Sequence, residues 1–312
     1  MSFSSDVKEE LFKKIPQGRH CKIAEISAII GMCGRIQISS NNRLRIRIHT
    51  ENSVVARKYF TLLKKTYNIE TVVSVRQSNK QSIYTITTIY HEDAVTVLQG
   101  SKLLDKYGNV REDLSIEDGL LVQKECCKRA YIRGSFLAGG SIIDPNKFYH
   151  LELVCNTQYK AEQLKKMISY FNINAKIVER KGHYVVYIKE GSDVVDTLSV
   201  MEAPVSLMNL ENVMILKDMR NSVNRRVNCE TANLNKTVSA AVKQIEDIKY
   251  IRDTVGLSKL SSNLQEIARL RLENGDASLK ELGEMLDPKV GKSGVNHRLR
   301  KISEIADGLR SK

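Results

Sequence analysis

The chain has 312 residues, of which 42% are hydrophobic, so it is long enough for two or three domains with buried cores and too mixed in composition for bulk disorder. Its formal net charge of +13 favours a polyanionic partner, with nucleic acid ahead of an acidic membrane surface. The sequence has no apolar run long enough to span a membrane, and its N-terminus lacks the apolar core of a signal peptide. We therefore expect a cytoplasmic protein without membrane contact.

The first part of the chain reads as a helix followed by alternating strands and helices. A small-residue helix over 22–36 precedes the alternating strand "RLRIRIHT" (43–50), which is followed by a helix over 52–67. Two further strands flank the polar loop "QSNKQ" (77–81), and a short helix closes the unit. Asn52 is a favourable N-cap for the second helix. In the strand over 43–50 the alternation places three arginines on one face: Arg43, Arg45 and Arg47.

The same order of elements returns about 105 residues later, which indicates a duplicated domain rather than a solenoid. The second copy opens on the helix "CCKRAYIRGSFLAGGSI" (126–142), and its last two strands flank "RKGH" (180–183). We place the duplicated domain at 1–217, with copies at about 1–105 and 119–217. Small residues let the two opening helices pack with their backbones close together: Gly31, Gly34, Gly134, Ala138, Gly139 and Gly140.

This order of elements, with small residues at the two helix ends, resembles the LAGLIDADG fold. The resemblance implies an α+β domain of two αββαββα copies, with the two motif helices at a pseudo-twofold axis. It also implies two four-stranded antiparallel sheets that form a DNA-binding saddle. In that family the metal-binding acid precedes the last glycine of each motif helix. Here those positions hold Cys33 and Gly139, neither of which is a hard oxygen ligand for Mg²⁺. Asp144 lies beyond the turn that follows the second motif helix. Because neither motif position holds an acid, we expect no catalytic residues.

The six cysteines show no C-x-x-C spacing, and the histidines are scattered along the chain. Cys126 and Cys127 are adjacent, which is poor geometry for a shared tetrahedral zinc ion. In a cytoplasmic protein we interpret the cysteines as reduced, mostly buried small apolar residues. The sequence therefore predicts no metal site and no cofactor.

A segment rich in Asn, Arg and Thr follows residue 217, and we assign 218–237 as a polar linker. One interpretation is a solvated connection between domains. The alternative is a segment whose guanidinium and amide groups contact phosphates or base edges. The candidates for such contacts are Arg220, Asn224, Arg225, Arg226 and Asn228.

Helical periodicity returns over 238–312, where the last three helices form a helix-turn-helix pattern. Ser278 and Glu281 form a capping box for a short helix over 278–286, and a third helix begins near Lys292. Ser293 is placed to cap that helix and to contact a phosphate. From residue 288 onward there are seven Lys or Arg against two Asp or Glu, which favours DNA contact over a merely solvated face. The long connection "DPKVGK" makes the arrangement similar to sigma factor region four.

A degenerate, duplicated LAGLIDADG frame with such an all-α helix-turn-helix domain resembles the WhiA family over essentially the whole chain. The segments that carry this resemblance are "RGSFLAGGSIIDP" (133–145), "MRNSVNRRVNCETANLNKT" (219–237) and "DPKVGKSGVNHRLRKISEIADGL" (287–309). The resemblance implies a bacterial, nucleoid-associated transcription regulator linked to cell division, chromosome segregation and sporulation. Two alternatives remain open: an interaction module that bridges a division protein to the chromosome, and a residual homing endonuclease.

We expect the helix over 292–301 to read double-stranded DNA, since Arg and Asn can bond bases bidentately. The side chains of this domain expected to contact DNA are Ser278, Lys280, Lys289, Lys292, Ser293, Asn296, His297, Arg298, Arg300 and Lys301. The N-terminal saddle is either a second DNA surface, through Arg43, Arg45 and Arg47, or a platform for a protein partner. Because the duplication already forms a pseudo-dimer within one chain, we expect a monomer.

Overall fold

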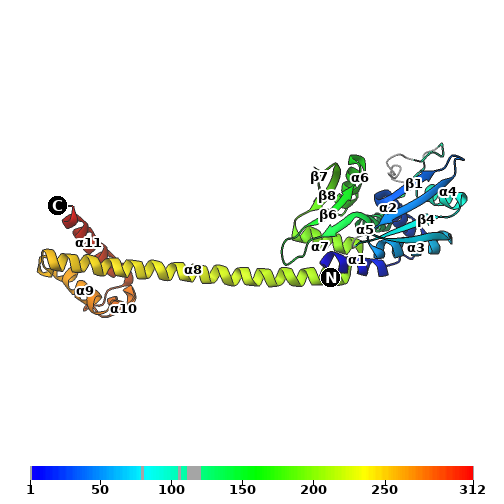
Figure 1. Cartoon of the computed structure of the whole chain (residues 1–312). Helices are drawn as coiled ribbons and strands as arrows, with labels where there is room; N and C mark the ends of the chain where they lie inside the picture. The colour runs from blue at the N-terminus through cyan, green and yellow to red at the C-terminus, as the bar shows by residue number, and fades with distance from the viewer. Residues whose placement is uncertain (1, 79–80, 105–106, 111–120, 312) are drawn as a thin grey trace. The chain divides into compact units, whose positions relative to one another are not determined.

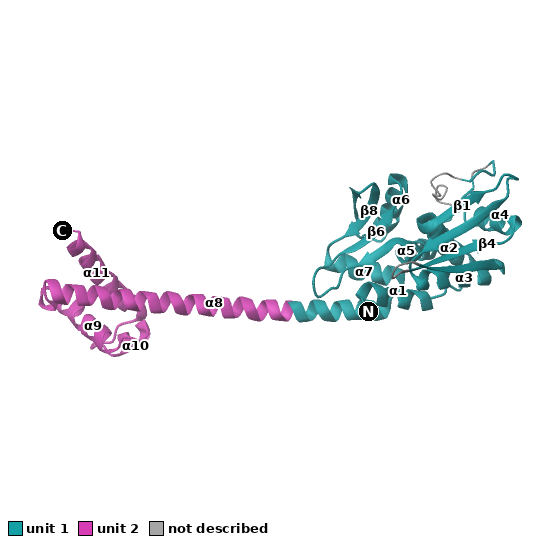
Figure 2. Cartoon of the chain, in the orientation of Figure 1, with its two compact units in different colours: residues 1–217 teal, residues 218–312 magenta. Residues whose placement is uncertain are grey.

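The computed structural model describes residues 2–78, 81–104, 107–110 and 121–311. These residues divide into two compact units, 1–217 and 218–312 (Figure 2). No helix in the described part is long and apolar enough to cross a bilayer.

The first unit contains the expected order of elements twice, after one additional helix, α1 (Phe3–Lys13) (Figure 1). The first copy comprises α2 (Arg19–Cys33), β1 (Gly34–Ile38), β2 (Leu44–Thr50), α3 (Ser53–Tyr67), β3 (Thr71–Ser78), β4 (Gln81–Thr88) and α4 (His91–Gly100). The second comprises α5 (Glu125–Gly139), β5 (Gly140–Ile142), β6 (Leu151–Cys155), α6 (Gln158–Ser169), β7 (Lys176–Arg180), β8 (His183–Ile188) and α7 (Gly191–Met201).

Each copy forms one four-stranded antiparallel sheet, which confirms the predicted fold class. The strand orders are β1-β2-β4-β3 and β5-β6-β8-β7, so the two sheets have the same topology. Local signals account for several boundaries. The Asn52 side chain accepts a hydrogen bond from the Val54 amide at the start of α3. Lys181 and Gly182 both have positive φ in the turn that joins β7 to β8, as a tight hairpin requires.

The motif helices α2 and α5 pack against each other at the centre of the first unit. Gly134 of α5 permits this approach. A Cβ atom at this position would lie 2.7 Å from the Glu25 carbonyl oxygen and 2.9 Å from Ala28 Cβ. At Gly134 a small residue is therefore what allows the backbones of α2 and α5 to lie close together, as the sequence predicts.

Replacing Gly134 with alanine is expected to destabilise the first unit, because the added methyl group collides with backbone that cannot rotate away. Overpacking of this kind costs about 1–3 kcal/mol. Gly308 provides a control in another helix, because a Cβ there meets no atom within 4 Å. Gly308→Ala should stabilise its own unit by up to about 1 kcal/mol, the helix preference for Ala over Gly. Thermal unfolding would measure both, and equal stabilisation by the two substitutions would contradict the close-packing account.

Charged side chains are buried beside this glycine. The Glu25 carboxylate of α2 is fully buried and lies 3.0 Å from Lys58 Nζ of α3 and 3.2 Å from Arg133 Nη2 of α5. Arg133 also donates to Glu202, at 2.8 Å, and Lys58 donates to the Leu11 carbonyl oxygen, at 2.9 Å. Burial lowers the pKa of Lys58, and the Glu25 carboxylate opposes that effect. The Glu25 carboxylate thus compensates Lys58, shares the compensation of Arg133 with Glu202, and ties α2, α3 and α5 together.

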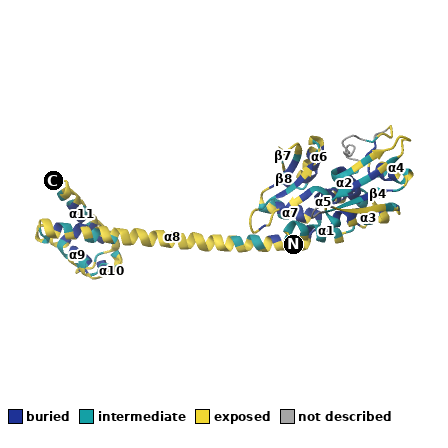
Figure 3. Ribbon diagram, in the orientation of Figure 1, coloured by how far each residue is buried: buried dark blue, intermediate teal, exposed yellow. Residues whose placement is uncertain are grey.

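The segment 218–237 differs from a conventional linker, because it is helical. It lies within one helix, α8 (Pro204–Thr254), that passes through the boundary between the two units. All its residues are exposed (Figure 3), which is compatible with both a solvated connection and a segment that contacts DNA, and its backbone is helical throughout. The reason is that residues 205–254 contain neither glycine nor proline to end a helix. The Asn and Thr content lowers helix propensity by only fractions of a kcal/mol per residue.

The second unit is all-α. After α8 it contains a 3₁₀ turn (Leu257–Lys259), α9 (Ser262–Glu273), α10 (Leu279–Glu284) and α11 (Lys292–Arg310). Its core is formed by apolar side chains that α8 contributes near its end together with those of the three shorter helices. The buried members are Ile248, Ile251, Leu260, Leu264, Ile267, Ala268, Leu282, Leu286, Val295, Leu299, Ile302 and Ala306.

Candidate nucleic-acid interface

The positions at which a LAGLIDADG nuclease carries its acids lie at the ends of α2 and α5. Cys33 is the last residue of α2, and burial raises the pKa of its thiol to about 12, so it is a neutral group at physiological pH. Gly139 is the last residue of α5, and a Cβ there would lie 2.9 Å from Met32 Cε and 3.0 Å from the Val154 carbonyl oxygen. A side chain at 139 would therefore displace the end of Met32 and press on strand β6 by a few tenths of an ångström.

Lysines lie near these helix ends. Lys160 is buried and donates to the Gly31 carbonyl oxygen at 2.7 Å. Lys8 is close enough to Cys33 to perturb it electrostatically, and burial lowers the pKa of Lys8 to about 8. Asp144 lies in an exposed turn and accepts hydrogen bonds from the backbone and side-chain amides of Asn146. Two ammonium groups are unfavourable neighbours for Mg²⁺, which is bound by oxygen ligands.

In the second unit, α10 begins with the expected capping box. The Ser278 hydroxyl accepts from the Glu281 amide at 3.3 Å, and the Glu281 carboxylate accepts from the Ser278 amide at 2.7 Å. This fixes where the first helix of the helix-turn-helix starts. Lys280 is exposed and lies 3.9 Å from Glu284 in the same helix.

The following helix, α11, begins at Lys292 as expected, but its N-cap is Gly291 rather than Ser293. Ser293 is the second helical residue, so its side chain cannot serve as the cap, and the capping prediction is wrong. Its side chain is exposed in the first turn, where backbone N–H groups have no partner within the helix. The first turn of α11 therefore keeps the geometry that suits a phosphate.

The first half of α11 separates apolar and polar side chains as its periodicity predicts. Val295, Leu299 and Ile302 are buried against α9 and α10. The rest of the helix circumference carries polar side chains that are exposed, or half-buried in the case of Arg298 at the edge of the apolar face: Lys292, Asn296, His297, Arg298, Arg300 and Lys301.

Few of these cations are engaged within the protein. Arg300 lies 3.1 Å from Glu304, one turn further along α11, and both side chains are largely exposed. Among the described residues, no salt bridge involves Lys289, Lys292, Arg298 or Lys301. Exposed ion pairs are worth about 1 kcal/mol or less, so Arg300 is also available to an incoming anion.

The linker candidates are distributed around α8 rather than gathered on one side. Arg220, Asn224 and Asn228 follow each other at four-residue spacing and so share one face of the helix. Arg225 lies beside that face. Arg226, two residues after Asn224, lies about 200° round the helix and faces the opposite side.

The open face of the first sheet is basic. In its strand pairing Arg35 of β1 is directly opposite Arg47 of β2, and Arg47 is followed along the strand by His49. Arg45 lies on the same face, and the intervening Ile46 and Ile48 are buried in the core. Arg43 is exposed in the turn before β2. Like charges paired across strands are unfavourable in the free protein, so this face suits an anionic partner.

A shallow pocket of about 400 Å³ lies on this face, lined in part by Arg45, Arg47 and His49. Burial lowers the pKa of His49, and the charges of Arg47 and Arg35 lower it further, so the ring is neutral at pH 7. Its Nδ1 lies 3.1 Å from Thr85 Oγ1. The Nε atom of Arg47 is buried without a hydrogen-bond partner in the described structure.

The equivalent face of the second sheet is neither basic nor open in the same way. Glu152 occupies its centre and lies 2.6 Å from His150 Nε2 and 3.3 Å from Arg180 Nη1. Val154 and Val178 are exposed beside it. The two copies thus present unequal charge, as their sequences indicate.

The cysteines include a group that the sequence pattern does not reveal. Ligand-type atoms of His20, Cys21, Cys126 and Cys127 all lie within 4.8 Å of one another, at the first turns of α2 and α5. Burial raises the pKa of Cys21 to about 12 and also raises that of Cys127, so these are neutral thiols when no cation is present. The interpretation of the cysteines as mostly buried apolar residues did not indicate this group, in which Cys21 and Cys127 are buried and Cys126 is exposed.

The fold defines a protein class in which a duplicated LAGLIDADG-like domain precedes a helix-turn-helix domain. Three family models match: the WhiA N-terminal LAGLIDADG-like domain over 19–104, the WhiA LAGLIDADG-like domain over 128–220 and the WhiA C-terminal HTH domain over 223–306. The chain belongs to the WhiA family.

Similar proteins cover the chain from end to end. It is 51% identical over 312 residues to a protein of Lachnoclostridium phytofermentans named "probable cell division protein WhiA", covering 99% of this chain and 100% of that one. A protein of Alkaliphilus oremlandii with the same name is 50% identical, covering 99% and 98%. The crystal structure of full-length DUF199/WhiA from Thermotoga maritima matches with a TM-score of 0.61 and 26% identity, covering 98% of both chains.

Proposed function

We propose that the chain is a sequence-specific DNA-binding transcription regulator that acts in cell division and does not cut DNA. The observation that carries this proposal is the outer face of α11, where basic and amide side chains lie on the helix that follows a capped α10. The names of the curated relatives supply the process, cell division. Chromosome segregation, sporulation and nucleoid association are further roles that the family resemblance suggests for it.

In the proposed complex α11 lies in the major groove with its N-terminal half against the bases. Asn296 and Arg300, which are one turn apart on the same side of α11, would bond base edges, since amide and guanidinium groups can do so bidentately. Arg298 lies about 200° round the helix from each of them, at the edge of the buried face, and would contact a phosphate. Phosphates would be held by Ser278, Lys280, Lys289, Lys292, Ser293, His297 and Lys301. Each phosphate contact contributes about 0.9 to the slope of log affinity against log salt, so binding should weaken steeply with salt.

The linker side chains have a more limited proposed role. Because they are distributed around α8, one DNA duplex would be contacted by only one face, that of Arg220, Asn224 and Asn228 with Arg225 beside it. Arg226 faces the opposite side and is the weakest candidate of the five.

The first unit is proposed to support binding rather than chemistry. Its basic sheet, with Arg45 and Arg47, suits DNA as a second contact, whereas the neutral second sheet offers Val154 and Val178 to a protein. A chromosome-associated module that bridges a division protein to DNA is therefore the second candidate, favoured by this inequality of the two sheets. A non-cutting role is supported by Cys33, whose thiol is neutral, and by Gly139, where a larger side chain would meet Met32 and Val154. The chain is proposed to act as a monomer.

The proposal is tested by capturing sheared genomic DNA with the purified full-length protein in Mg²⁺ and sequencing the fragments with their ends. We expect a few intact, promoter-proximal sites to be enriched. The same capture with Arg45→Ala/Arg47→Ala should recover the same sites with lower yield, because those arginines are assigned to phosphate contact.

Other outcomes would overturn parts of the proposal. New recurrent fragment ends would mean cleavage and would contradict the interpretation of Cys33 and Gly139. Uniform recovery of fragments from across the genome would contradict sequence-specific binding and favour the second candidate, a module that bridges a division protein to DNA. Loss of site preference in the Arg45→Ala/Arg47→Ala protein would move base reading from α11 to the first sheet.

A further inference from the structure

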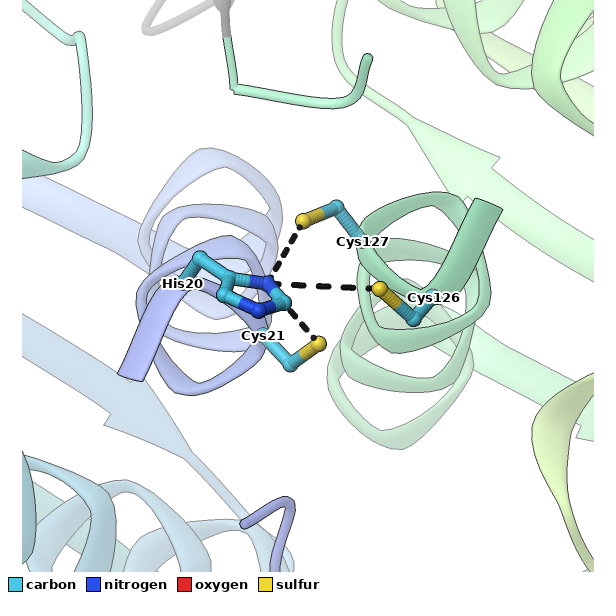
Figure 4. A group of neighbouring side chains, drawn as sticks. All are labelled: His20, Cys21, Cys126 and Cys127. Atoms are coloured by element: carbon cyan, nitrogen blue, oxygen red, sulfur yellow. Dashed lines mark hydrogen bonds between the residues drawn. The ribbon is translucent and has the colours of Figure 1, made fainter. Parts of the chain in front are cut away.

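The first turns of α2 and α5 bring three thiols together around one imidazole nitrogen, that of His20 (Figure 4). His20 Nδ1 lies 3.2 Å from Cys21 Sγ, 3.2 Å from Cys127 Sγ and 4.0 Å from Cys126 Sγ. Two ligands come from each helix, so the group spans the contact between the two copies. None of these side chains takes part in the proposed DNA contacts.

The pseudo-symmetry of the fold produces this arrangement. His20 and Cys126 are separated by 106 residues, and the bounds of α2 and α5 differ by the same interval. The pair His20–Cys21 in the first copy is therefore the counterpart of Cys126–Cys127 in the second. Adjacent residues make a poor site within one helix, but here two adjacent pairs converge from two helices. This is why no C-x-x-C spacing marks the group.

The distances suit a four-coordinate metal ion. With metal–sulfur bonds of about 2.3 Å and metal–nitrogen bonds of about 2.0–2.1 Å, a tetrahedral site has nitrogen–sulfur edges of about 3.5 Å. The three distances from His20 Nδ1 lie on either side of that value. The separations within the group reach up to 4.8 Å, compared with sulfur–sulfur edges of about 3.8 Å in such a site, so the side chains must draw closer together when the ion binds. Three sulfurs and one imidazole are a known ligand set for structural zinc.

The surroundings also favour the charged form of such a site. A divalent ion with three thiolates and a neutral imidazole carries a formal charge of −1. It would lie at the N-termini of two helices, each of which bears about half a positive charge. Lys124, the N-cap of α5, is near enough to act electrostatically on Cys127.

The structure provides space for the imidazole and a route for the ion. A Cβ atom at Gly18, the N-cap of α2, would lie 2.9 Å from His20 Nε2, so glycine leaves room for the ring in this orientation. The nearby pocket of about 380 Å³ is lined in part by Cys21 and Cys126, and the Cys126 side chain is exposed. An ion can therefore enter from solvent.

We propose that His20, Cys21, Cys126 and Cys127 bind one zinc ion that clamps the N-terminal ends of α2 and α5 together. On binding, the three thiols release three protons to solvent, three zinc–sulfur bonds and one zinc–nitrogen bond form, and no electron is transferred. All four positions around the ion are filled by protein, so the site is structural. The ion would hold the two copies together at the N-terminal ends of α2 and α5, whereas Cys33 and Gly139 lie at the C-terminal ends.

The test is the metal content of the full-length protein, purified without chelator under reducing conditions and measured by mass spectrometry. We expect one zinc per chain, and less than about a tenth of that in Cys126→Ser/Cys127→Ser, which removes two ligands. Cys229→Ser is the matched control, because Cys229 is exposed on α8 and lies outside the group. It should retain one zinc per chain.

A milder substitution keeps the test decisive if the double variant does not fold. His20→Ala leaves all three thiolates and should weaken zinc binding at least about tenfold in a chelator competition. Cobalt titrated into the metal-free protein should give the visible bands of a tetrahedral thiolate site, altered in His20→Ala and unchanged in Cys229→Ser. Removing zinc should lower the melting temperature of the unsubstituted chain.

Several results would overturn the proposal. One is a purified protein that contains no metal and gives no cobalt spectrum. Another is a zinc content in Cys126→Ser/Cys127→Ser equal to that of the unsubstituted chain, or iron in place of zinc in the latter. A disulfide between Cys21 and Cys126 or Cys127, in protein alkylated at lysis, would also overturn it.

Discussion

Replacing Arg298 and Arg300 together with alanine is expected to abolish sequence-specific DNA binding while leaving the second unit folded. A bidentate contact from Arg300 to a base is worth about 1–3 kcal/mol, so its loss should weaken the preferred site by about 5-fold to 150-fold, and losing the Arg298 phosphate contact weakens binding further. Neither side chain is part of the core, and the Arg300–Glu304 pair is too exposed to contribute much stability. Fluorescence anisotropy on the preferred and on a scrambled site would measure the change.

A matched control separates base reading from charge. Arg269 is exposed on α9, so Arg269→Ala removes one positive charge from the same unit without touching α11. It should lower affinity for the preferred and scrambled sites by the same small factor. Unchanged affinity of the Arg298→Ala/Arg300→Ala protein for its best site would show that α11 is not the reading helix.

Replacing Glu25 with glutamine is expected to destabilise the first unit severely. Glutamine retains the shape of the side chain but leaves Lys58 buried without a carboxylate partner, and leaves Arg133 with only the partly exposed Glu202. Removing one partner of a buried pair costs about 3–5 kcal/mol, a large part of the about 5–15 kcal/mol that stabilises a typical domain. For a unit of this size that corresponds to a loss of about 6–20 °C in melting temperature.

The control is a carboxylate in an exposed pair of the same unit. Glu9 lies 3.3 Å from Arg57, and both side chains are about half exposed. Glu9→Gln should cost about 1 kcal/mol or less. Thermal and urea unfolding of the two variants, followed by circular dichroism, would show the difference, and equal effects would contradict the role given to burial.

The duplicated fold and the helix-turn-helix were predictable because they depend on local signals. Alternation in "RLRIRIHT" predicts a strand with one buried face, and β2 buries Ile46 and Ile48 accordingly. Asn52 and Ser278 cap helices because a side-chain oxygen needs only the next turn of backbone. The capping prediction that failed also concerns a helix limit, because α11 is capped at Gly291 rather than at Ser293. The continuation of α8 through 218–237 was not indicated by the polar composition of that segment.

The sequence by itself determined the elements, their duplication, the polar face of the last helix and the absence of acids from the two motif positions. Only the tertiary structure decided that Glu25 pairs with Lys58 and Arg133, and that His20 and Cys21 meet Cys126 and Cys127. These partners are separated by more than 30 residues, and for most pairs by more than 100. Periodicity and capping act within one or two turns, whereas such contacts are set by how closely α2 and α5 pack.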